Sequence, residues 1–289
     1  MTTIGAGTAS ALLTALITVV DCSADTPPGV ASAPASDATS AATGLRLVAL
    51  GDSSSTGAGG TEGGGWVRRY ADLLQAKTGQ PVEVLNRASK GQASDSLASQ
   101  VESNQALRDE LAQADYIVIG AGGADLNDGD DAWAAGSCSG PAWYTTVLAD
   151  YRTNIARVAS SIAELRTDKP TVFRAVTPPN VLTGAEKVIP PFLRATATEI
   201  GVLQARSARE STCTALRAHG GECIDVLTAF NGADGTTDAY ASGLLNLTSC
   251  CYGSAQGQQR MAELLIQTGP TDSALPGPAA RGGPRTRRA

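Results

Sequence analysis

Histidine and aromatic residues are scarce in this sequence. Its 289 residues include one His, three Trp, six Tyr and three Phe. Such a chain has neither the aromatic platform on which nucleic-acid bases stack nor the histidine cluster that commonly binds zinc. Its net charge of −6 also argues against attraction to a phosphate backbone. We therefore expect no nucleic-acid partner, no metal and no other cofactor.

Large apolar residues are scarce near both ends of the chain. Residues 23–44 consist mainly of Ala, Ser, Thr and Pro, and residues 269–289 are rich in Gly, Pro and Arg. Segments of this composition cannot bury enough apolar surface to fold, so we predict a disordered linker and a disordered basic tail. The composition and size of residues 45–268 predict one compact domain between them.

Long hydrophobic runs are also missing. The apolar run Ala11–Val20 is too short to cross a bilayer as a helix and has about the length of a signal-peptide core, so residues 1–22 predict export. Cys22 follows this run and resembles the lipid-attachment cysteine of bacterial lipoproteins, but Asp21 occupies a position where that motif has a small residue. Secretion and a membrane tether through Cys22 both remain open. Each places the domain outside the bacterial cytoplasm.

Within residues 45–268, short apolar runs alternate with amphipathic stretches. The runs predict buried strands at Leu45–Leu50, Val82–Leu85, Tyr116–Ile119, Thr171–Val176 and Cys223–Val226. The amphipathic stretches predict helices at Trp66–Lys77, Asp95–Ala112, Tyr144–Arg166, Pro191–Ala218 and Ser254–Gln267. This alternation predicts an α/β fold of the flavodoxin-like kind, a three-layer α/β/α sandwich with a five-stranded parallel sheet. Ligands of such folds bind at the carboxyl ends of the strands.

Glycine-containing polar loops follow three of the expected strands. Gly51–Ser53 comes directly after the first strand, Asn86–Gly91 after the second and Gly122–Asp125 after the third. A lone Gly-Asp-Ser turn is usually only a helix-capping turn. Because parallel strands end at the same edge of a sheet, these loops should meet there and present the hydroxyl of Ser53.

The loops resemble the sequence blocks of the SGNH hydrolases, also known as GDSL-type esterases and lipases. Those proteins have Gly-Asp-Ser after the first strand, a glycine after the second, Gly-x-Asn-Asp after the third and Asp-x-x-His before the last helix. The resemblance covers residues 45–268 and implies the SGNH type of α/β fold. It also implies that Ser53 is the nucleophile and that the backbone N–H groups of Ser53 and Gly91 form part of the oxyanion hole.

Three positions depart from the family pattern. Ala124 stands where the family has the asparagine that completes the oxyanion hole. Before the last helix, Ser249 replaces the aspartate and Tyr252 replaces the histidine that would act as orienting acid and general base. A serine hydroxyl needs an adjacent base, and an ordinary phenol, with a pKa of about 10, is ionised to on the order of one part in a thousand at pH 7. The substitutions therefore predict a weak hydrolase.

Other residues are weaker candidates for the missing general base or the missing oxyanion donor. The only histidine, His219, lies where a helix is expected to end, at the opposite edge of the sheet, and is interpreted as a capping residue. The acidic run Asp125–Asp131 lacks EF-hand spacing and is interpreted as a solvated loop, not as a Ca²⁺ site or a substitute base. The glycine-rich stretch Gly57–Gly65 matches no nucleotide-binding motif. Replacement of the absent asparagine by Asn127 remains open.

Six cysteines in an exported chain predict disulfides. Cys213 and Cys223 flank an expected helix-to-strand turn and are the preferred pair. Cys138 could reach Cys250 or Cys251. The alternative, in which all are reduced and buried, would require a cytosolic chain.

Two functions remain open for this sequence. The retained Ser53 and Gly91 favour a monomeric serine ester hydrolase that acts on small acyl esters or acetylated glycans. Ala124, Ser249 and Tyr252 favour a catalytically silent domain that binds an acyl or glycan ligand. We prefer the hydrolase, because the nucleophile is in place in a match that extends over the whole domain.

Overall fold

The computed structural model describes residues 44–58, 64–127, 144–166, 171–186, 188–189, 191, 194–249 and 252–267. The predicted signal segment, linker and basic tail lie outside these ranges. So do Cys22, Cys138, Cys250, Cys251 and most of the acidic run after Asp125. Of the helices within the described ranges, none combines the length and the apolar character needed to cross a bilayer.

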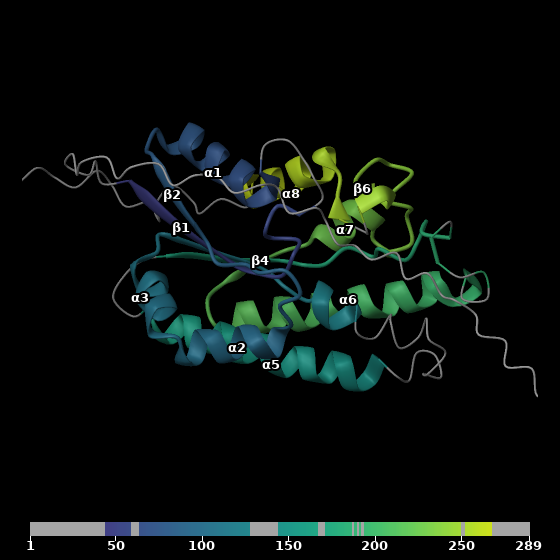
Figure 1. Cartoon of the computed structure of the whole chain (residues 1–289), viewed down its shortest axis with the longest axis horizontal. Coiled ribbons are helices and arrows are strands. Elements are labelled where there is room, and N and C mark those ends of the chain that lie inside the picture. Colours follow the sequence, from purple (N-terminus) through teal and green to yellow (C-terminus); the bar gives the residue numbers. More distant parts are fainter. Residues whose placement is uncertain are drawn as a thin grey trace, which may run out of the picture. The chain divides into compact units, whose positions relative to one another are not determined.

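A parallel five-stranded sheet forms the centre of the domain (Figure 1). Its strands are β1 (Leu45–Gly51), β2 (Val82–Asn86), β3 (Tyr116–Gly120), β4 (Val172–Val176) and β5 (Glu222–Ile224). They follow the order β2-β1-β3-β4-β5, and every neighbouring pair is parallel. The predicted fold class and all five predicted strands are confirmed.

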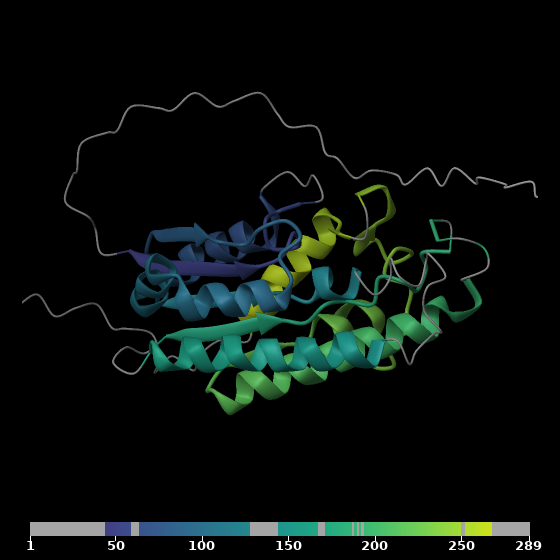
Figure 2. The same cartoon turned by 60° about the horizontal axis from the view of Figure 1, so that its bottom comes forward.

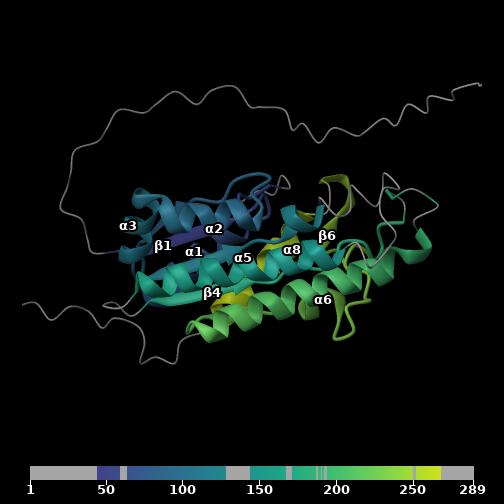
Figure 3. The same cartoon turned by 90° about the horizontal axis from the view of Figure 1, so that it is seen from below.

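Helices cover both faces of the sheet, as Figures 1 and 2 show. One face carries α1 (Gly65–Thr78) and α8 (Ala255–Gln267). The other carries α2 (Ser94–Ser103), α3 (Gln105–Gln113), α5 (Tyr144–Glu164) and α6 (Arg194–Ala218). On this second face α5 lies between α2 and α6 (Figure 3).

Alternating side chains of β1 divide the core into two layers. Val48 and Leu50 pack with the α2, α3, α5 and α6 side chains, whereas Leu47 and Ala49 pack with those of α1 and α8. Successive residues of a strand point to opposite faces, so a strand covered on both sides must be apolar throughout. This explains why the buried strands were visible in the sequence as continuous apolar runs.

Two predicted boundaries were wrong because polar side chains cap helices within the predicted elements. The single helix predicted over residues 95–112 is broken at Asn104, whose side chain accepts a hydrogen bond from Leu107 N and caps α3. The fifth strand ends at Ile224, since Asp225 accepts from Thr228 N and caps a short helix, α7 (Val226–Asn231). Neither α7 nor the break at Asn104 was predicted.

The sequence also gave no sign of a second, two-stranded sheet. Its antiparallel strands are β6 (Leu245–Asn246) and β7 (Tyr252–Gly253), and the one-turn 3-10 helix Leu247–Ser249 follows β6. Strands of two residues are too short to show a period-two pattern.

One disulfide is present in the described part of the chain. It joins Cys213, near the end of α6, to Cys223 in β5, which is the pair that the sequence favoured. The bond connects the C-terminal part of α6 to the strand that follows it.

Candidate active site

The turn that carries Ser53 begins at a glycine that no other residue could replace without strain. Gly51 has a φ of 128°, and a Cβ there would collide with the carbonyl oxygen of Gly120 in β3. The same carbonyl accepts a hydrogen bond from Asp52 N at 3.0 Å. This close approach of β1 to β3 places Ser53 at the carboxyl end of the sheet.

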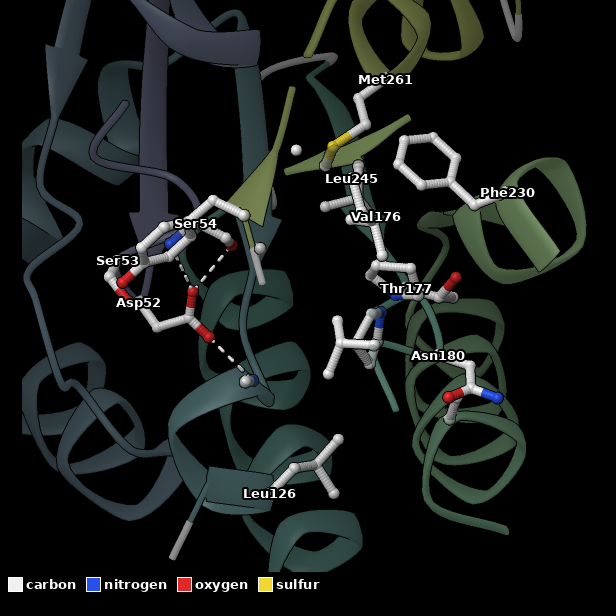
Figure 4. Close-up of a pocket in the computed structure, with 18 of the residues that line it drawn as sticks. Asp52, Ser53, Ser54, Leu126, Val176, Thr177, Asn180, Phe230, Leu245 and Met261 are labelled. Atoms are coloured by element: carbon white, nitrogen blue, oxygen red, sulfur yellow. Dashed lines mark hydrogen bonds between the residues drawn. The ribbon is translucent and has the colours of Figure 1, made fainter. Parts of the chain in front are cut away.

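The carboxylate of Asp52 joins the Ser53 turn to the loop after β3. Asp52 is only 2% exposed. Its Oδ1 accepts from the backbone N and the hydroxyl of Ser54, at 2.9 and 2.7 Å, and its Oδ2 accepts from Gly123 N at 2.9 Å (Figure 4). Burial raises the pKa of Asp52, and the hydrogen bonds from Ser54 and Gly123 partly oppose that rise. The turn is therefore held by a buried carboxylate that accepts hydrogen bonds from Ser54 and from the loop after β3.

The loop after β2 is tied to both of these loops. Ser89 N donates to Gly51 O at 3.0 Å. Ser94, at the start of α2, donates to the carboxylate of Asp125 through its backbone N at 3.1 Å and its hydroxyl at 2.5 Å. Between them lies Gly91, whose φ of 73° suits glycine. The three loops thus meet at one edge of the sheet, as the sequence predicted.

Two backbone N–H groups at this edge are unused by the protein. Within the described ranges, the N–H groups of Ser53 and Gly91 donate to no acceptor, whereas those of Asp52, Ser54 and Ser55 all do. Free N–H groups beside a nucleophile are what an oxyanion hole requires, and Ser53 lines the cavity whereas Gly91 is exposed and lies outside its lining. Their availability agrees with the oxyanion role that the family resemblance implies for Ser53 and Gly91.

A cavity of about 110 Å³ opens at Ser53. Figure 4 shows Asp52, Ser53 and Ser54 on one side of it, facing apolar side chains from β4, α7, β6 and α8. These apolar side chains are Val176, Phe230, Leu245 and Met261, and Leu126 closes the cavity below. The site can therefore hold an apolar group next to a serine hydroxyl.

The structure brings only some of the predicted site residues to this cavity. Ser53 and Tyr252 line the same cavity. Of the other residues predicted for the site, Gly91 and Ala124 do not line it, and the side chain of Ser249 lies outside the described part of the structure.

A glutamine of α8 holds the strand that carries Tyr252. The Gln258 side chain is buried; its Oε1 accepts from Trp66 N at 2.8 Å, and its Nε2 donates to Gly253 O at 3.4 Å. Gln258 thus connects the start of α1 to β7, next to Tyr252.

His219 lies away from this cavity. It belongs to the turn after α6, where its backbone N donates to Leu216 O at 3.0 Å. Its side chain lines a separate hollow between α5 and α6. His219 does not line the Ser53 cavity and does not replace the histidine missing at position 252.

Sequence reasoning missed the loop after β4, which forms another wall of the cavity. Thr177, Pro178, Pro179 and Asn180 follow Val176 directly and line the cavity. Asn180 is buried; its backbone N donates to Asn231 Oδ1 at 2.9 Å and its Nδ2 to Gly235 O at 2.9 Å. The position of Thr-Pro-Pro-Asn directly after a strand was the signal available for this wall.

A parallel α/β/α sandwich with a serine at an apolar cavity after its first strand is the arrangement expected of an SGNH-type hydrolase fold. A sequence model of the GDSL-like lipase/acylhydrolase family matches residues 49–260, more than half of the chain. The chain belongs to this family.

Solved structures of lipases have the same fold. A lipase from a goat rumen metagenome is 19% identical, with a TM-score of 0.62, over 78% of this chain and 97% of that one. An extracellular lipase from Streptomyces rimosus is 22% identical, with a TM-score of 0.54, over 78% of this chain and all of that one. A lipase/acylhydrolase from Enterococcus faecalis is 17% identical, with a TM-score of 0.51, over 77% and 94%. A search of curated protein sequences finds no significant match to this chain.

Proposed function

We propose that this chain is a serine ester hydrolase with Ser53 as its nucleophile. The Ser53 oxygen bonds to the ester carbonyl carbon, its proton passes to a base, and the carbonyl oxygen becomes an oxyanion. Collapse of this intermediate releases the alcohol with a proton and leaves an acyl group on Ser53. Water then cleaves that acyl-enzyme to the carboxylic acid and restores the hydroxyl.

The observation that carries the proposal is the position of Ser53. Its turn is fixed by the buried carboxylate of Asp52, it opens on the apolar cavity, and its own N–H is free together with that of Gly91. This is the arrangement that places a reacting carbonyl between a nucleophile and oxyanion donors.

The size of the cavity supports short acyl esters, including acetyl groups on glycans, as substrates. Its volume of about 110 Å³ is smaller than the roughly 150 Å³ of an apolar cavity that holds a benzene molecule. An acyl group of a few carbons fits such a space, and a long fatty acyl chain exceeds it. We therefore expect acetate and butyrate esters to react faster than palmitate esters.

We further propose that hydrolysis is slow, because the side chains that would activate Ser53 are absent. Tyr252 lines the cavity where the family pattern has histidine, and Ser249 occupies the aspartate position. Without a general base the serine loses a contribution to rate of about a hundredfold or more.

An extracytoplasmic location is part of the proposal. The disulfide between Cys213 and Cys223 supports an oxidising compartment, and the similar Streptomyces rimosus lipase is extracellular. The apolar run near the N-terminus supports export by the same reasoning. Mass spectrometry of the mature N-terminus would distinguish a released chain from one tethered through Cys22.

The alternative is a domain that binds an acyl or glycan ligand without hydrolysing it. The three substitutions at Ala124, Ser249 and Tyr252 favour it, because they remove reactive groups while the cavity remains. Both functions predict ligand binding, and only the first predicts turnover that depends on Ser53.

The deciding experiment measures p-nitrophenyl acetate hydrolysis by the purified domain beside a Ser53→Ala variant. We expect slow turnover by the native protein and only the buffer rate with the variant. Ser242→Ala is a matched control, since Ser242 is exposed and does not line the cavity. Equal rates for native protein and Ser53→Ala, with both folded, would favour the binding domain.

A further inference from the structure

The oxyanion hole of this chain lacks a side-chain donor. The family pattern supplies an asparagine at the position of Ala124, and a methyl side chain donates no hydrogen bond. The N–H groups of Ser53 and Gly91 then have to stabilise the oxyanion alone. Removing one such donor typically slows a hydrolase by about a hundredfold or more, so a replacement would matter.

A second asparagine lies one helical turn further along. Residues 123–127 are helical, and Leu126 N donates to Gly122 O at 3.1 Å. Ala124 and Asn127 are three residues apart, so their Cβ atoms lie on the same side of this turn, about 5–6 Å from each other. Helical side chains lean toward the N-terminus, and the carboxamide of Asn127 therefore extends over the turn that contains Ala124.

Asn127 lines the same cavity as Ser53 and is exposed. Ala124 does not line this cavity. Within the described part of the chain its carboxamide makes no hydrogen bond to another residue. Its side chain is exposed, so it can change rotamer without repacking the core. The backbone of this turn is nevertheless fixed, because Gly123 N donates to the buried carboxylate of Asp52.

We propose that the carboxamide of Asn127 donates the oxyanion hydrogen bond that Ala124 lacks. Its Nδ2 would bind the negatively charged oxygen of the tetrahedral intermediate beside the N–H groups of Ser53 and Gly91. Because the side chain of Ala124 is small, it leaves room for the longer side chain of Asn127 to approach the oxyanion. This inference rests on the proposed hydrolysis at Ser53 and concerns the same site.

The test is a double-mutant cycle at positions 124 and 127, read as kcat and KM for p-nitrophenyl acetate. We expect Asn127→Ala to lower kcat tenfold to a hundredfold with little change in KM, because the hydrogen bond forms mainly in the transition state. Ala124→Asn should restore kcat in the Asn127→Ala background. In the native background it should give a smaller gain, because one donor is already present.

Asn104→Ala controls for loss of stability. Asn104 caps α3 and does not line the cavity, so this variant should lose stability and keep the native kcat. An unchanged kcat for Asn127→Ala, while native turnover depends on Ser53, would overturn the role of Asn127 and leave the proposed function intact. A loss that Ala124→Asn does not rescue would also overturn it. Absence of Ser53-dependent turnover in the native protein would overturn the proposed function, and the inference with it.

Discussion

Two sides of the candidate site are built in different ways. The nucleophile side, residues 51–58, 87–93 and 121–127, consists of the segments that follow β1, β2 and β3, held by hydrogen bonds to the buried carboxylate of Asp52 and the half-buried carboxylate of Asp125. The base side, residues 245–249 and 252–254, consists of two strands of two residues each and one turn of 3-10 helix. Burial raises the pKa of both aspartates on the nucleophile side, whereas Tyr252 on the base side is only half-buried.

This difference shows which parts of a hydrolase depend on the backbone and which on a single side chain. A nucleophile at a strained turn and free N–H groups are consequences of how the strands end, so the fold preserves them. A general base is one side chain on a short surface element. A change of that side chain need not disturb the sheet or the cavity, and Tyr252 occupies the position where the family resemblance implies the base.

The largest predicted effect comes from repairing the base side. Tyr252→His combined with Ser249→Asp should raise Ser53-dependent esterase turnover about a hundredfold, the usual contribution of a positioned general base. The measurement is kcat for p-nitrophenyl acetate. Adding Ala124→Asn should raise turnover further, by a margin that depends on whether Asn127 is present.

Ser53→Ala in the repaired protein is the control and should return the rate to that of the buffer. If the repaired protein is folded and remains inactive, the cavity has diverged beyond its reactive groups, and the ligand-binding alternative becomes the better account. Binding of short carboxylic acids, measured by calorimetry, would then be the next observation.

A smaller effect is predicted for the nucleophile side. Asp52→Asn leaves either Gly123 N–H or a Ser54 donor facing an amide NH₂ group, so the variant should lose about 1–3 kcal/mol of unfolding free energy. Its kcat should fall as well, because the Ser53 turn is no longer tied to the loop after β3. Urea denaturation and ester hydrolysis measure the two effects.

The pH dependence of the same variant has a definite sign. Because burial raises the pKa of Asp52, the folded protein holds this proton more tightly than the unfolded chain does. The stability of the native protein relative to Asp52→Asn should therefore be largest below pH 4. It should fall as the pH rises from the ordinary aspartate pKa of about 4 through the raised value. A constant difference between pH 3.5 and 7 would contradict the burial of this charge.

Sequence reasoning succeeded for the strands and the nucleophile side because their signals are local. A strand covered on both faces is a continuous apolar run, and the loops that follow β1, β2 and β3 contain their glycines and Ser53 within a few residues. Helix α3 was merged with α2 because the apolar spacing continues through Leu107 and Leu111, and only the cap at Asn104 separates the two helices.

The base side and the apolar wall of the cavity could not be predicted from the local sequence. Two-residue strands have no periodicity, so the β6–β7 sheet left no pattern. Phe230, Leu245 and Met261 meet at the cavity only in the folded protein, since they come from three separate elements. Tyr252 was found through the family resemblance and not through its local sequence.

The most direct test of the account is the pH–rate profile of Ser53-dependent ester hydrolysis, with the Ser53→Ala rate subtracted at each pH. If the nucleophile side is complete and the base side is empty, kcat/KM should rise by about tenfold per pH unit from pH 6 to 9 without levelling off, because hydroxide then takes the serine proton. The Tyr252→His, Ser249→Asp protein should instead level off above about pH 7, as a histidine base requires. A native profile that already levels off near neutrality would contradict the account, since it would show a working base in this site.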